Sequence, residues 1–245
     1  MNFESDIPTI FPTEITALVS KRNLSVFPPF GFSPGGAVSW GNPLQLHEHR
    51  VLLANALGLP HETLRFQRQT HGAVVRVVGK HTAGADESDG MITDEAEVAL
   101  CISLADCAAI LAYDPNTRTL GAFHSGWRGT QQKISQTGLI RMAERFGADP
   151  KEILVYVSAC AGGRAYQVGE EVARYFPDSV IPADNGKFLL DVRNEIRRQV
   201  IDIGIMPEHI EVSESCTITD ERYHSFRRDG RFSGRMAAAI VLKSA

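Results

Sequence analysis

The sequence has few cysteines and no long apolar run, and both absences narrow its class. The four cysteines, at positions 101, 107, 160 and 216, form neither a CxxC pair nor a disulfide-dense pattern, which argues against a disulfide-stabilised secreted module. No run approaches the roughly 18 apolar residues of a membrane span. The N-terminal residues are acidic and lack the basic-then-apolar order of a secretion signal. We therefore expect a cytoplasmic protein with reduced thiols.

An excess of basic residues is also absent. The formal net charge is −4 and the isoelectric point is about 6.1, so neither nucleic acid nor an anionic membrane is an expected partner. No internal repeat, heptad pattern or self-pairing strand edge stands out, and a monomer is the default expectation. Hydrophobic residues make up 43% of the 245 residues, enough for a large core in one domain or in two closely fused halves.

Alternating strand and helix patterns predict a mixed α/β fold. Apolar runs typical of strands lie at 24–27, 64–67, 73–78, 98–102, 108–113, 120–124, 153–157, 210–212 and 236–242. Helical periodicity favours helices at 49–57, 130–146, 168–176 and 191–203. Residues 1–20 have an irregular pattern, and the polar, glycine-containing segment 81–94 predicts a loop. The strand, helix and strand between 120 and 157 form a unit of the kind that gives parallel pairing.

The most unusual stretch is HSGWRG at 124–129, directly after an apolar run. A turn from a strand into a helix places side chains at a helix N-terminus, where backbone N–H groups and the helix dipole favour anions. We expect His124 to bind a ligand there, and Arg128 to hold a negatively charged group with the helix N-terminus after Gly129. Trp127 is interpreted as a packing residue that fixes the turn.

Two further candidates, His71 and Cys107, lie where predicted strands end or break. A His, Cys and His set is a borderline-soft group of donors that suits zinc, with copper as a competitor. Three protein ligands leave a fourth position for water or substrate. The spacing is long, with 36 residues from His71 to Cys107 and 17 more to His124. Each residue alone has a simpler explanation. His71 would be a turn histidine, Cys107 a small apolar side chain that fills the core, and His124 a core histidine.

The chain carries an ordered set of motifs: QTHG at 69–72, ADC at 105–107, HSGWRG at 124–129, CT at 216–217, FRRDG at 226–230 and GR at 234–235. Taken together, these motifs resemble the YfiH-like family, also called the laccase-domain or multicopper polyphenol oxidase family. The resemblance runs from about residue 31 to residue 242. It implies a single domain over 1–245, an α+β (mixed α/β) class and a four-layer α/β/β/α sandwich with mixed sheets.

The resemblance also implies a function and a metal site. Family members are purine nucleoside phosphorylases that also deaminate adenosine, and the expected substrates are phosphate with adenosine, inosine, guanosine or methylthioadenosine. The family's zinc ligands fall here on His71, Cys107 and His124. Zinc can lower the pKa of a bound water to about 7 and so supply the hydroxide that deaminates adenine at C6.

Other candidate roles belong to residues near these motifs. Phosphorolysis requires an anion aimed at the ribose C1′, for which Arg128 is the first candidate. Arg164 and Arg227 are further candidates for contact with phosphate, although a solvated surface arginine is the simpler interpretation of each. Asp106 is a candidate to orient a ligand or relay a proton, or else a capping residue of a turn. Cys107, His124, Arg128 and Asp106 thus form the expected catalytic set.

Three segments depart from the family pattern. Ser33 and Pro34 stand where relatives carry Thr-Arg before a Gly-Gly pair. Residues 43–47 replace a longer stretch, and residues 158–163 lack the Gly-Pro of the corresponding family loop. An arginine that contacts substrate from the first segment would have no counterpart here. We therefore expect a changed rim of the substrate pocket around an intact metal triad.

Other functions stay open from the residues alone. A metal-free hydrolase would use Cys107 as nucleophile and His124 as base. A copper-dependent polyphenol oxidase would use the same His₂Cys set, but a multicopper enzyme needs further histidine clusters and the chain has eight histidines. A non-catalytic, structural zinc site would need a fourth ligand, for which Cys160 is the candidate. Family analogy adds a role in editing cell-wall precursors.

Overall fold

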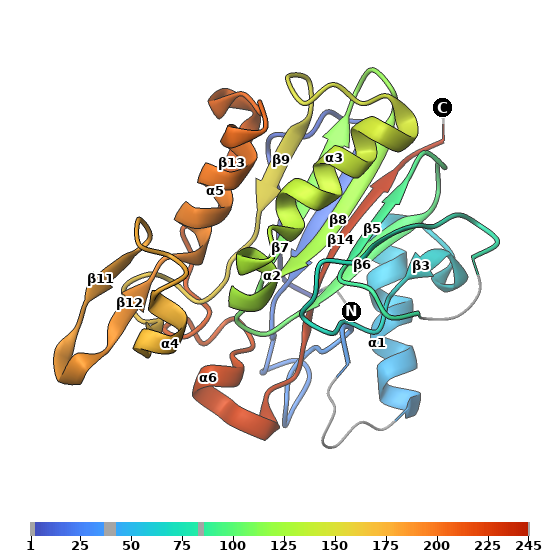
Figure 1. Cartoon of the computed structure of the whole chain (residues 1–245). Helices are drawn as coiled ribbons and strands as arrows, with labels where there is room; N and C mark the ends of the chain where they lie inside the picture. Colours follow the sequence, from blue (N-terminus) through green and yellow to red (C-terminus); the bar gives the residue numbers. More distant parts are fainter. Residues whose placement is uncertain (1–2, 37–42, 83–85, 245) are drawn as a thin grey trace.

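Two large mixed β-sheets form the centre of the molecule (Figure 1). The computed structural model describes residues 3–36, 43–82 and 86–244. One sheet consists, in spatial order, of β1 (Ser5–Asp6), β2 (Ile15–Ser20), β14 (Met236–Leu242), β6 (Ala99–Leu104) and β3 (Leu64–Arg65). The other consists of β13 (Ile210–Val212), β9 (Leu154–Val157), β7 (Ala108–Asp114), β8 (Thr119–Ser125), β5 (Gly90–Thr93) and β4 (Val75–Val77). Each sheet contains both parallel and antiparallel pairs, which confirms the predicted class.

Alternation of side chains along the strands builds four layers. Leu100 and Ile102 of β6 point into a core shared with Leu111 of β7, between the two sheets. Cys101, between them in sequence, points to the opposite face and packs against α1 (Pro43–Leu57). The outer face of the six-stranded sheet is covered by α3 (Ile134–Phe146) and α5 (Val192–Asp202), which Figure 1 shows on the side away from α1. The layer order is α/β/β/α, as the family resemblance implied.

The remaining elements are short. The helices α2 (Trp127–Gln131), α4 (Glu170–Ala173) and α6 (Phe226–Asp229) have at most five residues. A small sheet of β10 (Gln167–Val168), β12 (Phe188–Leu190) and β11 (Val180–Pro182) projects at the lower left of Figure 1. Single 3-10 turns lie at His61–Thr63, Asp184–Gly186, Pro207–His209 and Gly230–Phe232. In the part of the chain described, no helix has the length and apolar character needed to cross a bilayer.

Several predicted elements were wrong. The predicted strand at 24–27 is a turn, because Leu24 and Val26 are exposed and pair with no strand in the described residues. The predicted loop at 81–94 contains β5, a fully buried strand whose four residues are too few to give a periodic signal. β2 lies within the segment 1–20 that looked irregular. The single helix predicted at 130–146 is α2 and α3, separated at Lys133, whose φ is 58°.

The parallel unit between 120 and 157 also differs from the prediction. β8 and β9 are both antiparallel to β7, so they run in the same direction, but β7 lies between them. The tight connection from Asp114 to Thr119 keeps β7 beside β8 as a hairpin. β9 therefore pairs with the free side of β7. That the whole of 1–245 is one domain stays a prediction.

The approach of α3 to β8 gives a stability prediction. An ideal Cβ at Gly138 would lie 2.6 Å from Cδ1 of the fully buried Phe123. Alanine favours the helix by about 1 kcal/mol over glycine, but overpacking a filled core costs about 1–3 kcal/mol. We predict a lower free energy of unfolding in urea for Gly138→Ala, and an unchanged or slightly higher one for the exposed neighbour Thr137→Ala. Equal stability of Gly138→Ala and the parent chain would contradict this packing.

Candidate functional site

The β7–β8 hairpin brings two of the predicted ligands together. Ala109 pairs with His124 and Ala108 with Ser125, so Cys107 lies opposite Gly126 where the hairpin opens. An ideal Cβ on Gly126 would lie 2.7 Å from Sγ of Cys107, closer than real side chains approach. Glycine in the HSGWRG motif therefore leaves the space that the thiol occupies.

The turn between β3 and β4 supplies the third residue. His71 has a positive φ of 62°, uncommon for a non-glycine residue and a form of strain that clusters at functional sites. Its ring centroid lies 4.9 Å from that of His124. The ligand atoms of His71, Cys107 and His124 all lie within 4.8 Å of one another. The structure thus brings the three predicted residues to one place, from turns and strands far apart in the sequence.

A buried carboxylate that the sequence did not reveal joins these segments. Asp89, 1% exposed, precedes β5 and accepts hydrogen bonds from the backbone N–H groups of Thr70 (3.1 Å), His71 (2.9 Å) and Gly72 (2.7 Å). Its Oδ1 also lies 2.8 Å from Nδ1 of His124. Asp89 was missed because segment 81–94 was interpreted as a loop. A chemical rule could have indicated such a residue, because a metal-binding histidine usually donates its second ring N–H to a carboxylate or carbonyl.

Mutual electrostatics set the charge of this group. Burial raises the pKa of Asp89, but hydrogen bonds from His124 and from backbone N–H groups outweigh burial and lower the pKa to about 2. Burial likewise opposes ionisation of Cys107, yet the charge and hydrogen bond of His124, together with His71, lower its pKa to about 6. The pKa of His124 rises to about 9 despite burial, because Cys107 and Asp89 stabilise its charged form. The thiolate is the form of cysteine that binds metals.

A cavity of about 750 Å³ adjoins the three residues, within the size range of small-molecule sites. Its lining includes three aromatic rings, each with an arginine over it. The guanidinium of Arg128 lies 4.3 Å from the ring centroid of Trp127. The corresponding distances are 5.0 Å for Arg227 over Tyr166 and 5.6 Å for Arg235 over Phe226. The cavity thus offers flat apolar surfaces and positive charge next to the His-Cys-His group.

The arginines predicted to bind phosphate occupy different places. Arg128 and Arg227 are exposed and line the cavity, and Nη1 of Arg227 donates to the carbonyl of Gln167 at 2.8 Å. Arg164 is exposed and is not among the cavity-lining residues in the described chain, so its contact with phosphate stays a prediction. The helix begins at Trp127, not after Gly129, and has five residues. The start of the helix is thus two to three residues earlier than the sequence-based expectation, and anion binding at its N-terminus stays a prediction.

Asp106 connects three segments around the cavity. It has a positive φ of 84°, and its Oδ1 accepts from Oγ1 of Thr217 at 2.7 Å. Its Oδ2 accepts from the backbone N–H of Arg227 at 2.6 Å, and its carbonyl accepts from the N–H of Ala161 at 2.8 Å. Both carboxylate oxygens are thus engaged in holding the turn. The structure supports an orienting role, and direct catalysis by Asp106 stays a prediction.

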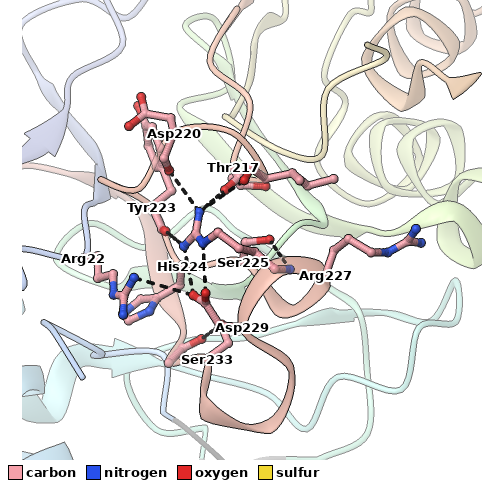
Figure 2. A network of polar contacts seen from close by, with 12 residues as sticks. Arg22, Thr217, Asp220, Tyr223, His224, Ser225, Arg227, Asp229 and Ser233 are labelled. Carbon is pink, nitrogen blue, oxygen red and sulfur yellow. Dashed lines mark hydrogen bonds and ion pairs between the residues drawn. The ribbon is translucent and has the colours of Figure 1, made fainter. Parts of the chain in front are cut away.

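The two arginines of the FRRDG motif have different roles: Arg228 stabilises the loop, and Arg227 lines the cavity. Figure 2 shows the network of polar contacts around Thr217, Tyr223 and Asp229. Arg228 donates from Nη1 to the carbonyl of Thr217 at 2.9 Å and from Nη2 to the carbonyl of Tyr223 at 2.8 Å. It also donates to both carboxylate oxygens of Asp229 at 2.9 Å. Arg228 therefore fixes the loop that presents Phe226 and Arg227 to the cavity.

Cys160, the candidate fourth ligand, does not join the triad. It is fully buried, belongs to the core beneath α5 and is bridged to Cys216 by backbone pairing. In the ranges 3–36, 43–82 and 86–244, the group of close metal-ligand side chains comprises His71, Cys107 and His124 alone. A closed four-ligand site of structural type is therefore not what these residues form.

Known proteins resemble this chain over almost its whole length. The family model described as multi-copper polyphenol oxidoreductase laccase matches residues 17–243. A Deinococcus radiodurans protein named purine nucleoside phosphorylase is 34% identical over 205 residues, covering 82% of this chain and 79% of that protein. Purine nucleoside phosphorylase YlmD of Geobacillus stearothermophilus is 30% identical over 248 residues, covering 94% and 90%. The crystal structure of YlmD from the same organism matches with a TM-score of 0.89 at 28% identity, covering 97% of this chain and 94% of that chain.

The role of Asp89 is testable by metal binding. In Asp89→Asn the amide N–H₂ group would face donors that need an acceptor, so the QTHG turn and the ring of His124 would lose their common anchor. Loss of such a supporting carboxylate typically costs about 10- to 100-fold in metal affinity. We predict that weakening in a competition titration of zinc against a chromophoric chelator. The exposed neighbour Glu87→Gln is the control, and equal zinc affinity of both variants would contradict the role of Asp89.

Proposed function

The chain belongs to the multi-copper polyphenol oxidoreductase laccase family, and from that membership we propose that it is a zinc-dependent purine nucleoside phosphorylase that also deaminates adenosine. The observation that carries the proposal is the convergence of His71, Cys107 and His124 beside a cavity of about 750 Å³. The proposed substrates are adenosine, inosine, guanosine and methylthioadenosine, with phosphate as the co-substrate. The printed names of similar proteins support the same activity.

The donor set fits zinc. Two imidazoles and one thiolate are ligands that zinc accepts, and three protein ligands leave one position for water or substrate. Nδ1 of His124 is engaged by Asp89, which leaves Nε2 for a metal, the arrangement found around catalytic zinc. Zinc bound there would act as a Lewis acid at neutral pH. Copper shares the preference for this set, but a multicopper cluster needs additional histidines, and the described residues contain one such group.

The cavity walls suit the two halves of the reaction. In phosphorolysis a phosphate oxygen bonds to the ribose C1′ as the bond from C1′ to the purine nitrogen breaks, which yields free purine and ribose 1-phosphate. Tyr166 and Phe226 offer flat surfaces on which a purine can stack. The arginines of the lining supply the positive charge that positions an anion and stabilises it in the transition state. In deamination a water molecule replaces the C6 amino group of the bound adenosine, which yields inosine and releases ammonia.

A metal-free hydrolase is the second candidate, because the same residues also form a Cys-His-Asp arrangement. Asp89 holds His124 through Nδ1, and the ligand atoms of His124 and Cys107 lie within 4.8 Å of each other. These are the positions of orienting acid, base and nucleophile in cysteine hydrolases. The two candidates differ in whether Cys107 binds a metal or attacks the substrate.

Further properties stay predictions. These are the cytoplasmic location, the monomeric state and the absence of nucleic-acid or membrane partners. A role in editing cell-wall precursors is likewise an expectation from family analogy.

Purified, zinc-loaded protein is predicted to release adenine from adenosine only when phosphate is present, with ribose 1-phosphate as the second product. A smaller amount of inosine is expected without phosphate. Chromatography of the products measures both reactions. If folded protein with confirmed zinc gives neither adenine nor inosine, the proposal fails.

A second prediction separates the two candidates. Cys107→Ala should lose zinc and purine release together, whereas Cys101→Ala, altered at a buried thiol against α1, should keep its zinc. Removing zinc from the parent protein with a chelator should abolish activity, and added zinc should restore it. Activity that survives complete removal of zinc would favour the Cys107 hydrolase instead.

A further inference from the structure

The cavity carries more positive charge than its own residues neutralise. Among the residues that the structure describes, its lining contains Arg128, Arg227 and Arg235 but only one carboxylate, that of Asp106. Both oxygens of Asp106 are already engaged, by Thr217 and by a backbone N–H. In the residues described, none of the three arginines has a carboxylate within 4.0 Å. An anionic ligand would complete this charge distribution.

Arg235 differs from the other two arginines in its environment. Arg128 and Arg227 are exposed, whereas Arg235 is half-buried. Burial lowers the pKa of Arg235 and the charges of Cys107 and Asp106 oppose that shift, so the guanidinium is partly desolvated and lies in the field of the site. A partly desolvated charge that has no carboxylate partner is costly to keep. An anion that binds to Arg235 gains more electrostatic free energy than an anion that binds to a solvated arginine, because less water competes for the guanidinium.

The backbone of Arg235 is held firmly in place. Its N–H donates to Oγ of Ser33 at 2.8 Å, and its carbonyl accepts from the N–H of Gly35 at 3.2 Å. An ideal Cβ on Gly35 would lie 2.9 Å from Cβ of Arg235, so the glycine permits this close packing. The cavity wall of Gly35, Gly36 and Arg235 therefore takes its positive charge from Arg235.

Within the described residues, hydrogen bonds hold the guanidinium of Arg235 through one of its three nitrogens only. Nη1 of Arg235 donates to the carbonyls of Ser233 (3.0 Å) and Gly234 (2.9 Å). In the described part of the chain, its Nε and Nη2 groups have no hydrogen-bond partner. Two adjacent N–H donors of a guanidinium match the spacing of two oxygens of a phosphate.

From these observations we propose that Arg235 binds the phosphate that attacks the nucleoside, through the Nε and Nη2 edge of its guanidinium. The assignment rests on the proposed phosphorylase function. It makes Arg128 and Arg227 secondary, exposed contributors. The ligand class is a free tetrahedral oxyanion, with inorganic phosphate as its representative.

The test uses the full-length, zinc-loaded protein and titration calorimetry with inorganic phosphate. Arg235→Gln should weaken phosphate binding about 10- to 100-fold, the usual value of a charge-assisted pair. The phosphate affinity of Arg235→Lys, which keeps the charge but not the bidentate geometry, should lie between those of Arg235→Gln and the parent protein. The KM for phosphate should rise in parallel, while the KM for adenosine stays near that of the parent. Arg231→Gln is the matched control, since Arg231 lies over Phe232 at 4.9 Å and is exposed outside the cavity lining.

Each outcome decides the assignment. Undiminished phosphate binding by folded Arg235→Gln and Arg235→Lys, or no phosphate binding by the parent protein, would overturn it. Phosphate binding that disappears in Arg235→Gln while the parent releases no purine would support the anion site and refute the proposed function. Titration with adenosine 5′-monophosphate distinguishes the source of the phosphate group. If Arg235→Gln weakens only the nucleotide and not inorganic phosphate, the site serves a nucleotide and the assignment is wrong.

Discussion

The site depends on the buried carboxylate of Asp89. A single side chain accepts the N–H groups of three consecutive residues of the QTHG turn and the Nδ1–H of His124. These bonds hold His71 in a left-handed conformation that its backbone would otherwise avoid. Because the side chain of Asp89 is fully buried, these bonds from the protein replace those that bulk water would make. The backbone of His71 and the ring of His124 are therefore positioned relative to each other before any ligand arrives.

The β-sheet frame gives this polar cluster a rigid support. The register of β7 and β8 sets Cys107 against Gly126, and β5 on the other side of β8 leads directly from Asp89. These three strands are buried on both faces, by the second sheet on one side and by α3 and α5 on the other. Movement of Cys107 away from His124 would require a shift in the register of β7 against β8 in a packed sheet, which is costly.

The sequence allowed the triad and the general class to be predicted, but not the residues that support them. The long apolar runs of β7, β8 and β14 and the ordered motifs are strong local signals. β5 has four residues, and Asp89 precedes it without any periodic pattern, so its role follows only from tertiary contacts. The position of β9 beside β7 depends on closure of the β7–β8 hairpin. The break between α2 and α3 at Lys133 depends on the packing of α2 against α5. Arg235 gains its significance from the Ser33–Gly35 segment, about 200 residues away in the sequence.

The central claim is that His71, Cys107 and His124 hold one catalytic zinc ion. Anomalous scattering at the zinc edge from crystals of the zinc-loaded protein tests it most directly. The account predicts one zinc bound by two histidine nitrogens and the thiolate of Cys107, with a coordination position free of protein ligands. Zinc bound elsewhere, or closed at this place by a fourth protein ligand, would contradict it.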